Sequence, residues 1–207
     1  MIADTEYTHA SAKEKTSKTE KEKVANKAKA ASAKKAEGDA LGEMAHYYEE
    51  AEQLGLGLRL PDVYYPALNR LGAMLLRAEG QKLTLDGDYL TTVSRAVEAH
   101  ADTAPDFWNV VAQVDLRVYS ALANVALVDA LPGVLAGYDD LQRRINQTWQ
   151  WASVCDQMEF VLRKYKLKAD KAERDAANAL AEYLATLASV RRPTPPPRRR
   201  RRSRQAK

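Results

Sequence analysis

The chain has 207 residues, with 32 Lys and Arg against 28 Asp and Glu, for a net charge of +4. This length is enough for one domain with flanking tails. The single cysteine excludes an internal disulfide framework and fits a reducing compartment. There is no run of about 18 apolar residues that would span a membrane, and the N-terminus lacks the apolar stretch of a secretory signal. We therefore expect a soluble, intracellular protein of the cytoplasm.

The net charge combines three regions of different sign. Residues 191–207 hold nine Lys and Arg and no acid, whereas residues 1–38 hold nine Lys against six acids. Subtracting these contributions of +9 and +3 from the total of +4 leaves −8 for residues 39–190. The sequence therefore predicts an acidic folded domain over 39–190 between two basic segments.

The N-terminal segment, residues 1–38, consists mostly of Ala, Lys, Ser, Thr and Glu, with few large apolar side chains. Ala and Lys favour helix, but a segment without an apolar face to bury does not offset its ordering entropy. We predict that this arm is disordered or forms a transient, solvated helix. The alternative, a basic arm for nucleic acid or lipid, is opposed by the near balance of its lysines and acids.

Between residues 39 and 190, apolar side chains recur at helical spacing, and no stretch alternates strictly or contains an Asn-Gly hairpin turn. We expect the first helix to begin at Asp39 and to end at Gly55, the second to stop at Gly80, and Asp106 to cap the fourth. The fold class is therefore all-α. The predicted helices cover residues 39–54, 63–79, 88–101, 106–126, 129–144, 149–165 and 169–189.

Two of these helices start with the same motif. Pro61-Asp62-Val63-Tyr64-Tyr65 and Pro105-Asp106-Phe107-Trp108 lie 44 residues apart, counted from proline to proline. A Pro-Asp pair caps a helix because the carboxylate accepts hydrogen bonds from the free N–H groups of the first turn. A repeat near 40 residues predicts stacked helical hairpins, a tetratricopeptide-like α-solenoid. Such arrays bind other macromolecules, and a last helix at 169–189 either caps the stack or pairs with a second copy.

The same motifs carry a family resemblance. The segment Asp62 to Asn69, with the sequence Asp-Val-Tyr-Tyr-Pro-Ala-Leu-Asn, and the later Asp106-Phe107-Trp108 resemble the TRAFs-binding region. This tetratricopeptide-like helical module occurs in certain MAP kinase kinase kinases and in bacterial multidomain signalling and conflict proteins. The resemblance covers about residues 39–165. It implies a protein-interaction scaffold in signalling or defence, with an unidentified protein partner and no catalytic residues.

This sequence departs from the family pattern at two places. Residues 112–126 lack the glycine that normally closes such a helix hairpin, and Leu131-Pro132-Gly133 is expected to interrupt the next element. The 207 residues do not include the domains that are usually fused to the module, which leaves open that the chain is a fragment of a larger signalling protein.

The sequence does not predict an enzyme, a cofactor or a metal site. Glu43 and His46 have the Glu-x-x-His spacing of di-iron helical bundles, but the second pair and the further glutamates of such a site are missing. Cys155 lies in an apolar-periodic helix, so we expect a buried, unreactive thiol. No Gly-x-Ser-x-Gly motif, Gly-rich phosphate loop or His-Glu-x-x-His motif is present.

Four pairs of aromatic residues provide the candidate binding surface. In the three pairs of adjacent residues the two side chains point about 100° apart on a helix, so one can pack in the core while its neighbour lines the surface. For a peptide-binding groove we predict Tyr65, Asn69 and Trp108, with Arg70 or Arg95 as a charged rim. The alternatives are that these rings only fill the inter-helix core and that Asn69 bonds a neighbouring backbone. The pairs are Tyr47/Tyr48, Tyr64/Tyr65, Phe107/Trp108 and Trp149/Trp151.

The C-terminal segment supports a second hypothesis. Residues 193–197 are four prolines and a threonine, which predict an extended spacer within a disordered tail. The arginines that follow can neutralise phosphates and bind polyanions without reading their sequence. The protein would then associate with nucleic acid through this tail and oligomerise through its helical body. The alternatives are a solubilising tail and a tail that folds back on the acidic body. The polyanion-binding residues are Arg198, Arg199, Arg200, Arg201, Arg202 and Arg204.

Overall fold

The computed structural model describes residues 3–58, 60, 63–85, 88–103, 105–145 and 147–189. Within these residues the chain is all-helical, as predicted, and contains no strand. The predictions for the arginine-rich tail and for Asp62 as a helix cap concern residues outside this part of the chain. The helices are α1 (Ala3–Leu58), α2 (Tyr64–Ala78), α3 (Tyr89–Thr103), α4 (Phe107–Asn124), α5 (Leu127–Arg144), α6 (Thr148–Tyr165) and α7 (Lys171–Ser189).

Helix α1 is much longer than predicted. It runs without a break from Ala3 to Leu58, so the expected start at Asp39 is wrong, and the arm predicted as disordered or transiently helical belongs to this helix. The side chains of residues 22–40 are exposed, so packing does not explain their conformation. A helix that is already nucleated gains one hydrogen bond for each residue it adds. Because Ala, Lys and Glu favour that extension, the packed second half of α1 can extend into the arm.

Two further helix boundaries differ from the prediction. Gly55 does not end α1 but lies buried inside it, where a Cβ would come within 2.8 Å of Val63 Cγ2. Glycine thus lets the end of α1 approach the start of α2 closely. Pro132 does not interrupt α5, which is continuous around it. The proline removes only the hydrogen bond to the carbonyl four residues earlier, Val128, in the first turn of the helix.

Asp106 caps α4 as predicted. Asp106 Oδ1 accepts from the backbone N–H of Asn109 at 2.9 Å, and Asn109 Oδ1 accepts from the backbone N–H of Asp106 at 3.0 Å. This reciprocal pair is a capping box, which satisfies two N–H groups that the helix itself cannot. The start of α4 is therefore fixed by its own sequence.

The start of α5 is capped by a side chain from α7, which the sequence analysis missed. Its own N-cap residue, Ala126, has no side-chain group that can accept. The carboxylate of Glu173 accepts from the backbone N–H groups of Leu127 at 3.0 Å and of Val128 at 3.2 Å, and from the hydroxyl of Tyr165 at 2.6 Å. Glu173 is only 4% exposed, so these bonds join α5, α6 and α7 in the interior.

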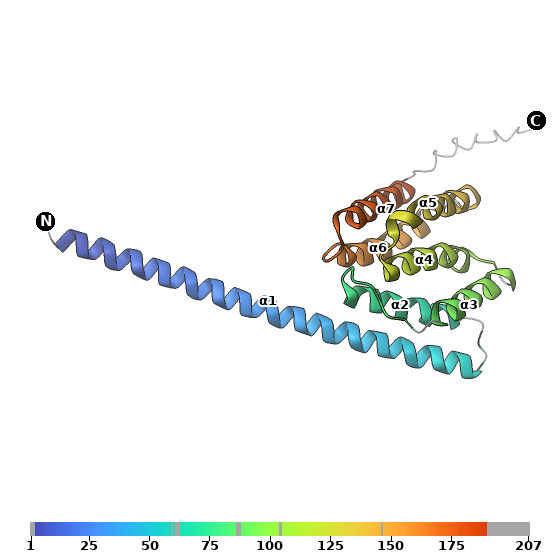
Figure 1. Cartoon of the computed structure of the whole chain (residues 1–207), viewed down its shortest axis with the longest axis horizontal. Coiled ribbons are helices and arrows are strands. Elements are labelled where there is room, and N and C mark those ends of the chain that lie inside the picture. Colours follow the sequence, from blue (N-terminus) through green and yellow to red (C-terminus); the bar gives the residue numbers. More distant parts are fainter. Residues whose placement is uncertain are drawn as a thin grey trace, which may run out of the picture.

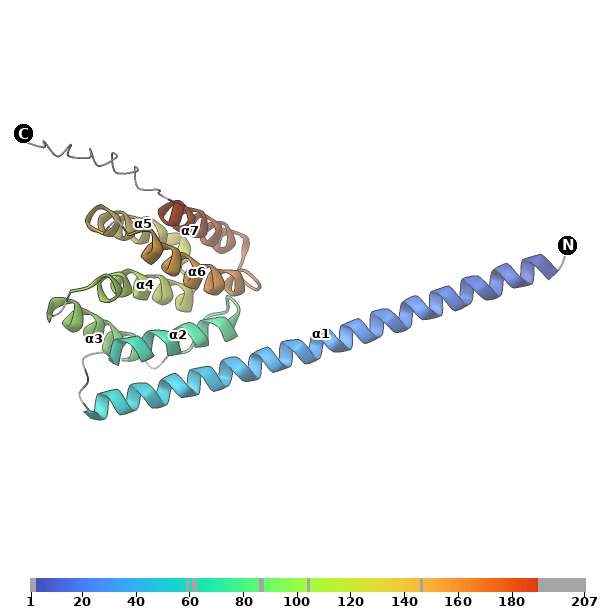
Figure 2. The same ribbon diagram turned by 180° about the vertical axis from the view of Figure 1, so that it is seen from behind.

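The helices lie in layers (Figures 1 and 2): α1, then α2 with α3, then α4 with α6, then α5 with α7. Helix α2 packs against α1, α3, α4 and α6, and α6 packs against α2 and α7. In a solenoid each unit contacts only its neighbours along the chain, whereas the contact of α2 with α6 joins more distant elements. The tetratricopeptide-like arrangement therefore stays a prediction.

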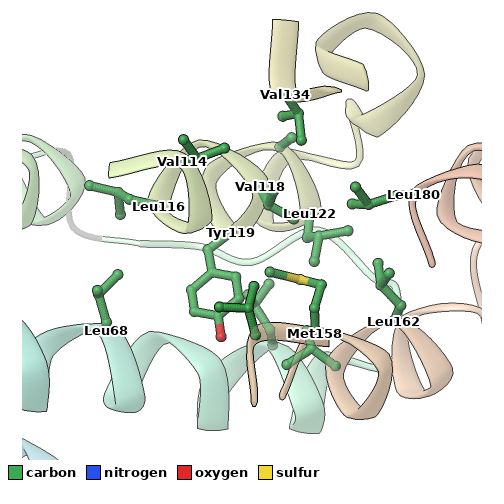
Figure 3. Packing of buried hydrophobic residues seen from close by; sticks show 14 of the residues in the cluster. Leu68, Val114, Leu116, Val118, Tyr119, Leu122, Val134, Met158, Leu162 and Leu180 are labelled. Carbon is green, nitrogen blue, oxygen red and sulfur yellow. The ribbon is translucent and has the colours of Figure 1, made fainter. Parts of the chain in front are cut away.

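One apolar cluster runs through these layers and forms the core. Figure 3 shows Tyr119 of α4 pointing toward α2, with Met158 of α6 beside it. The hydroxyl of Tyr119 accepts a hydrogen bond from Gln157 Nε2 at 3.0 Å, so the buried ring keeps a polar partner. The largest fully buried side chains are Trp151, Tyr119, Tyr138 and Tyr165.

Candidate functional site

Three of the four aromatic pairs divide between core and surface. In each of them one ring is at most 8% exposed and the neighbouring ring is 40–62% exposed. The exposed ring of each pair remains available for contact with another molecule. The pairs, with the buried ring first, are Tyr64/Tyr65, Phe107/Trp108 and Trp151/Trp149.

Tyr65, Asn69 and Trp108, which were predicted together, line one groove of about 780 Å³. This aromatic groove lies where the starts of α2 and α4 meet the end of α1, the end of α3 and the first part of α6. Its other lining side chains are mostly apolar. They include Leu60, Val63, Pro66, Leu68, Val111 and Val154.

Ring contacts hold Trp108 and Trp149 in place at the groove. The Trp108 ring lies edge-on to Phe107, with the ring centroids 4.9 Å apart, and its centroid is 6.0 Å from that of Trp149. Phe107 in turn contacts Trp151 at 5.4 Å, and Trp151 Nε1 donates to the carbonyl of Ile145 at 3.0 Å. Trp108 and Trp149 therefore lie on a rigid support in the core.

Asn69 bonds a neighbouring backbone group, which was the alternative interpretation of this residue. Its Nδ2 donates to the carbonyl of Tyr65 at 2.8 Å, one helical turn earlier. This bond holds the half-buried amide against α2, next to the exposed Tyr65 ring. Whether Asn69 also contacts a partner stays a prediction.

Asp115 of α4 also lines the groove, and the sequence analysis missed it. Its Oδ1 accepts from the hydroxyl of Tyr138 at 2.6 Å. Burial raises the pKa of Asp115 to about 7, although the hydrogen bond from Tyr138 opposes this shift. The sequence could have indicated this residue, because Asp115 is an acid next to Val114 and Val118, which belong to the apolar stripe of α4.

The raised pKa predicts a dependence of stability on pH. The unfolded carboxyl titrates near pH 3.9, so the folded state binds this proton more tightly. The resulting stability is present below about pH 4 and is lost as the pH rises through about 7. We expect Asp115→Asn, whose Oδ1 still accepts from Tyr138, to be about 1–3 kcal/mol more stable than the native chain at about pH 8 and similar at about pH 4.

Urea denaturation across this pH range measures the difference. Asp156→Asn, which replaces an exposed acid of α6, is the matched control and should follow the native curve. Parallel curves for the native chain and Asp115→Asn would contradict the prediction.

The structure places neither predicted rim arginine at the groove. Arg70 lies in a separate hollow with its guanidinium 3.0 Å from Glu52 Oε2 and 2.6 Å from Glu49 Oε1, and 5.1 Å from the centre of the Tyr89 ring. It therefore ties α1 to α2 and α3. Arg95 is exposed on α3 and does not line the aromatic groove. The polar and charged groups at the groove are instead Asn69, His100, Asp106, Asp115, Ser153 and Gln157.

The other residues considered for chemistry lie apart from the groove. His46 pairs with Glu50 at 3.3 Å, one turn away on the exposed face of α1. Cys155 is half-buried, and burial, followed by the charges of Glu159 and Asp156, raises the pKa of its thiol. Among the described residues, no three His, Cys, Asp or Glu side chains cluster so that they could hold a metal ion.

Comparison with protein-family models, curated proteins and solved structures finds no match to this chain. Within the part that the structure describes, no helix is long and apolar enough to cross a membrane. The aromatic groove is therefore the strongest basis for a function.

Proposed function

We propose that this chain is a non-catalytic protein-interaction module that binds a segment of a partner in the aromatic groove. The observation that carries the proposal is the position of Tyr65 and Trp108, which line one apolar groove while 61% and 40% exposed. Exposed Tyr and Trp side chains on a rigid support are the usual centres of binding energy in protein interfaces. Trp149, beside Trp108, extends this surface.

The surroundings of the groove favour a polypeptide over a small molecule. Leu56, Leu58 and Leu60, where the chain passes from α1 to α2, are 46–61% exposed. Leu60 also lines the groove, so the groove continues into further exposed apolar side chains. An exposed apolar surface that extends beyond one hollow is typical of a protein-binding site. The resemblance to the TRAFs-binding region agrees with a scaffold or adaptor.

Capture of binding proteins with two variants tests this function. We expect Tyr65→Ala with Trp108→Ala to lose proteins that the native chain retains, because each anchoring ring contributes about 1–3 kcal/mol. Tyr47→Ala is the matched control, since Tyr47 is 75% exposed on α1 and does not line the groove. Equal capture by the native chain and both variants would reject the groove as the binding site.

The same experiment distinguishes the adaptor function from the nucleic-acid hypothesis. Binding to Arg198 and the arginines after it would weaken with salt, because phosphate contacts release counterions. Material that leaves with salt or nuclease, and that the native chain and the groove variant retain equally, would favour nucleic-acid association over the adaptor.

A further inference from the structure

We infer that the aromatic groove takes a proline-rich segment followed by arginine, and that residues 193–198 of this chain are such a ligand, docking on their own molecule. The inference rests on the proposed function and names the ligand class of that same groove. It makes the C-terminal segment a built-in competitor for outside partners.

The sequence of the segment suits such a groove. Residues 193–198 read Pro-Thr-Pro-Pro-Pro-Arg. Prolines favour the polyproline II conformation, which has three residues per turn, so Pro193 and Pro196 would lie on the same side. A proline-rich segment loses little entropy when it binds in this conformation, and aromatic-lined grooves recognise it.

The groove offers matching chemistry for both parts of the ligand. Tyr65, Trp108 and Trp149 expose ring surfaces on which proline rings can pack. The exposed carboxylate of Asp106 also lies among the lining residues. A guanidinium such as that of Arg198 binds carboxylates through paired N–H donors. The groove can therefore contact both prolines and the arginine.

Two contacts between α5 and α7 show that the segment can reach the groove. Glu173 bonds Leu127 at the starts of the two helices, and the Tyr183 hydroxyl donates to Asp139 further along. The helices are therefore parallel, and α7 ends beside the end of α5. The chain passes from there directly into α6, and Figures 1 and 2 show the end of α7 at the same end of the stack as the starts of α4 and α6.

The length of the segment is sufficient for this path. Polyproline II rises about 3.1 Å per residue, so residues 190–192 span about 9 Å toward the groove and residues 193–198 span about 19 Å more along it. Packed helix axes lie only about 8–10 Å apart. The charges also favour docking, because residues 191–207 carry nine Lys and Arg and residues 39–190 carry a net charge of −8.

NMR signals of the tryptophan indole N–H groups in the full chain test the inference. The chain has three tryptophans. Replacing Pro193, Pro196 and Arg198 together with alanine is expected to shift the signals of Trp108 and Trp149. Trp151 is the internal reference, because it is 2% exposed and its indole is bonded to Ile145. The matched variant Arg200→Ala, Arg201→Ala, Arg202→Ala removes more charge but leaves the proline motif intact, so it should shift Trp108 and Trp149 much less than the motif variant does.

Unchanged Trp108 and Trp149 signals in the motif variant would overturn the inference, as would equal shifts in both variants. A shift that depends on protein concentration would show docking between molecules and would overturn docking on the same molecule. A synthetic peptide of residues 191–204 should bind the motif variant at least about tenfold more tightly than the native chain, because the native segment competes at high effective concentration. Equal affinity for the two chains would contradict the inference.

The outcomes also separate this inference from the proposed function. If the motif variant shows no change while Tyr65→Ala with Trp108→Ala still loses captured proteins, the groove binds other partners and only the inference fails. If the peptide binds but no captured protein depends on Tyr65 or Trp108, the proposed adaptor function fails.

Discussion

Gly80→Ala is expected to destabilise the fold by about 4 kcal/mol or more, an exceptional value for a single methyl group. Gly80 follows the end of α2 with a φ of 88°, a region that residues with a Cβ rarely adopt. A Cβ at this place would lie 2.0 Å from the carbonyl oxygen of Tyr165 and 2.8 Å from the amide nitrogen of Ala169. Both are backbone atoms, so no side-chain rotation relieves the contact.

The turn around Gly80 cannot shift easily to accommodate the extra atom. The carbonyl of Glu79 accepts from the backbone N–H of Lys168 at 2.9 Å. The Glu79 carboxylate pairs with the ammonium groups of Lys168 at 2.9 Å and Lys34 at 3.4 Å, which lowers its pKa through the Lys168 hydrogen bond most of all. Moving this turn would therefore disturb the contacts of α2 with α1 and with the connection from α6 to α7.

Chemical denaturation followed by circular dichroism measures this loss. Gly133→Ala is the matched control, because Gly133 lies exposed in α5 with nothing within 4 Å of an added Cβ. We expect that control to gain about 0.5–1 kcal/mol, the usual effect of replacing glycine by alanine in a helix. If Gly80→Ala were as stable as the native chain, the close approach of this turn to Tyr165 would be wrong.

Glu173→Ala is expected to be the second most damaging substitution, with a loss of about 3 kcal/mol or more. It removes the carboxylate that accepts from the N–H groups of Leu127 and Val128 and from the Tyr165 hydroxyl. A buried donor left without a partner costs about 1–3 kcal/mol. Glu173→Gln keeps one acceptor oxygen in a side chain of the same size, so a smaller loss of about 1–2 kcal/mol is expected.

Hydrogen exchange shows where the effect of Glu173→Ala arises. The amides of Leu127 and Val128 should exchange faster relative to the rest of α5, since their acceptor is gone. Glu182→Ala, at an exposed position of the same helix, should change stability by less than about 0.5 kcal/mol. Equal stabilities of Glu173→Ala and Glu182→Ala would refute the capping role.

The sequence predicts the helices of this fold better than their ends. Local signals are reliable where a residue acts on its own neighbourhood, as Asp106 does in capping α4. These local signals mislead where contacts with distant parts of the chain determine the end or the cap of a helix. Glycine often ends a helix, but Gly55 lies inside α1 and packs closely against Val63. Glu173 caps α5, which starts 46 residues earlier in the chain.

The candidate site could be predicted only in part, for the same reason. Helical geometry alone indicates that one ring of an adjacent pair, such as Tyr65 or Trp108, can be exposed while its neighbour is buried, but not which of the two it is. It does not show on which side of the stack a charge lies, because this depends on which helices are neighbours. Arg70 follows Asn69 directly, yet it faces Glu49 and Glu52 of α1 instead of the groove.

Helix α1 also determines how the molecule moves in solution. Its 56 residues correspond to about 84 Å at 1.5 Å per residue. The contacts at Lys34 with Glu79 and at Glu37 with Lys164 lie well along the helix, and Figures 1 and 2 show its first half projecting away from the other helices. Such a shape has high friction for its mass, so a monomer should elute from a sizing column ahead of globular standards. Early elution would therefore not demonstrate a dimer, and light scattering or sedimentation equilibrium is needed to count subunits.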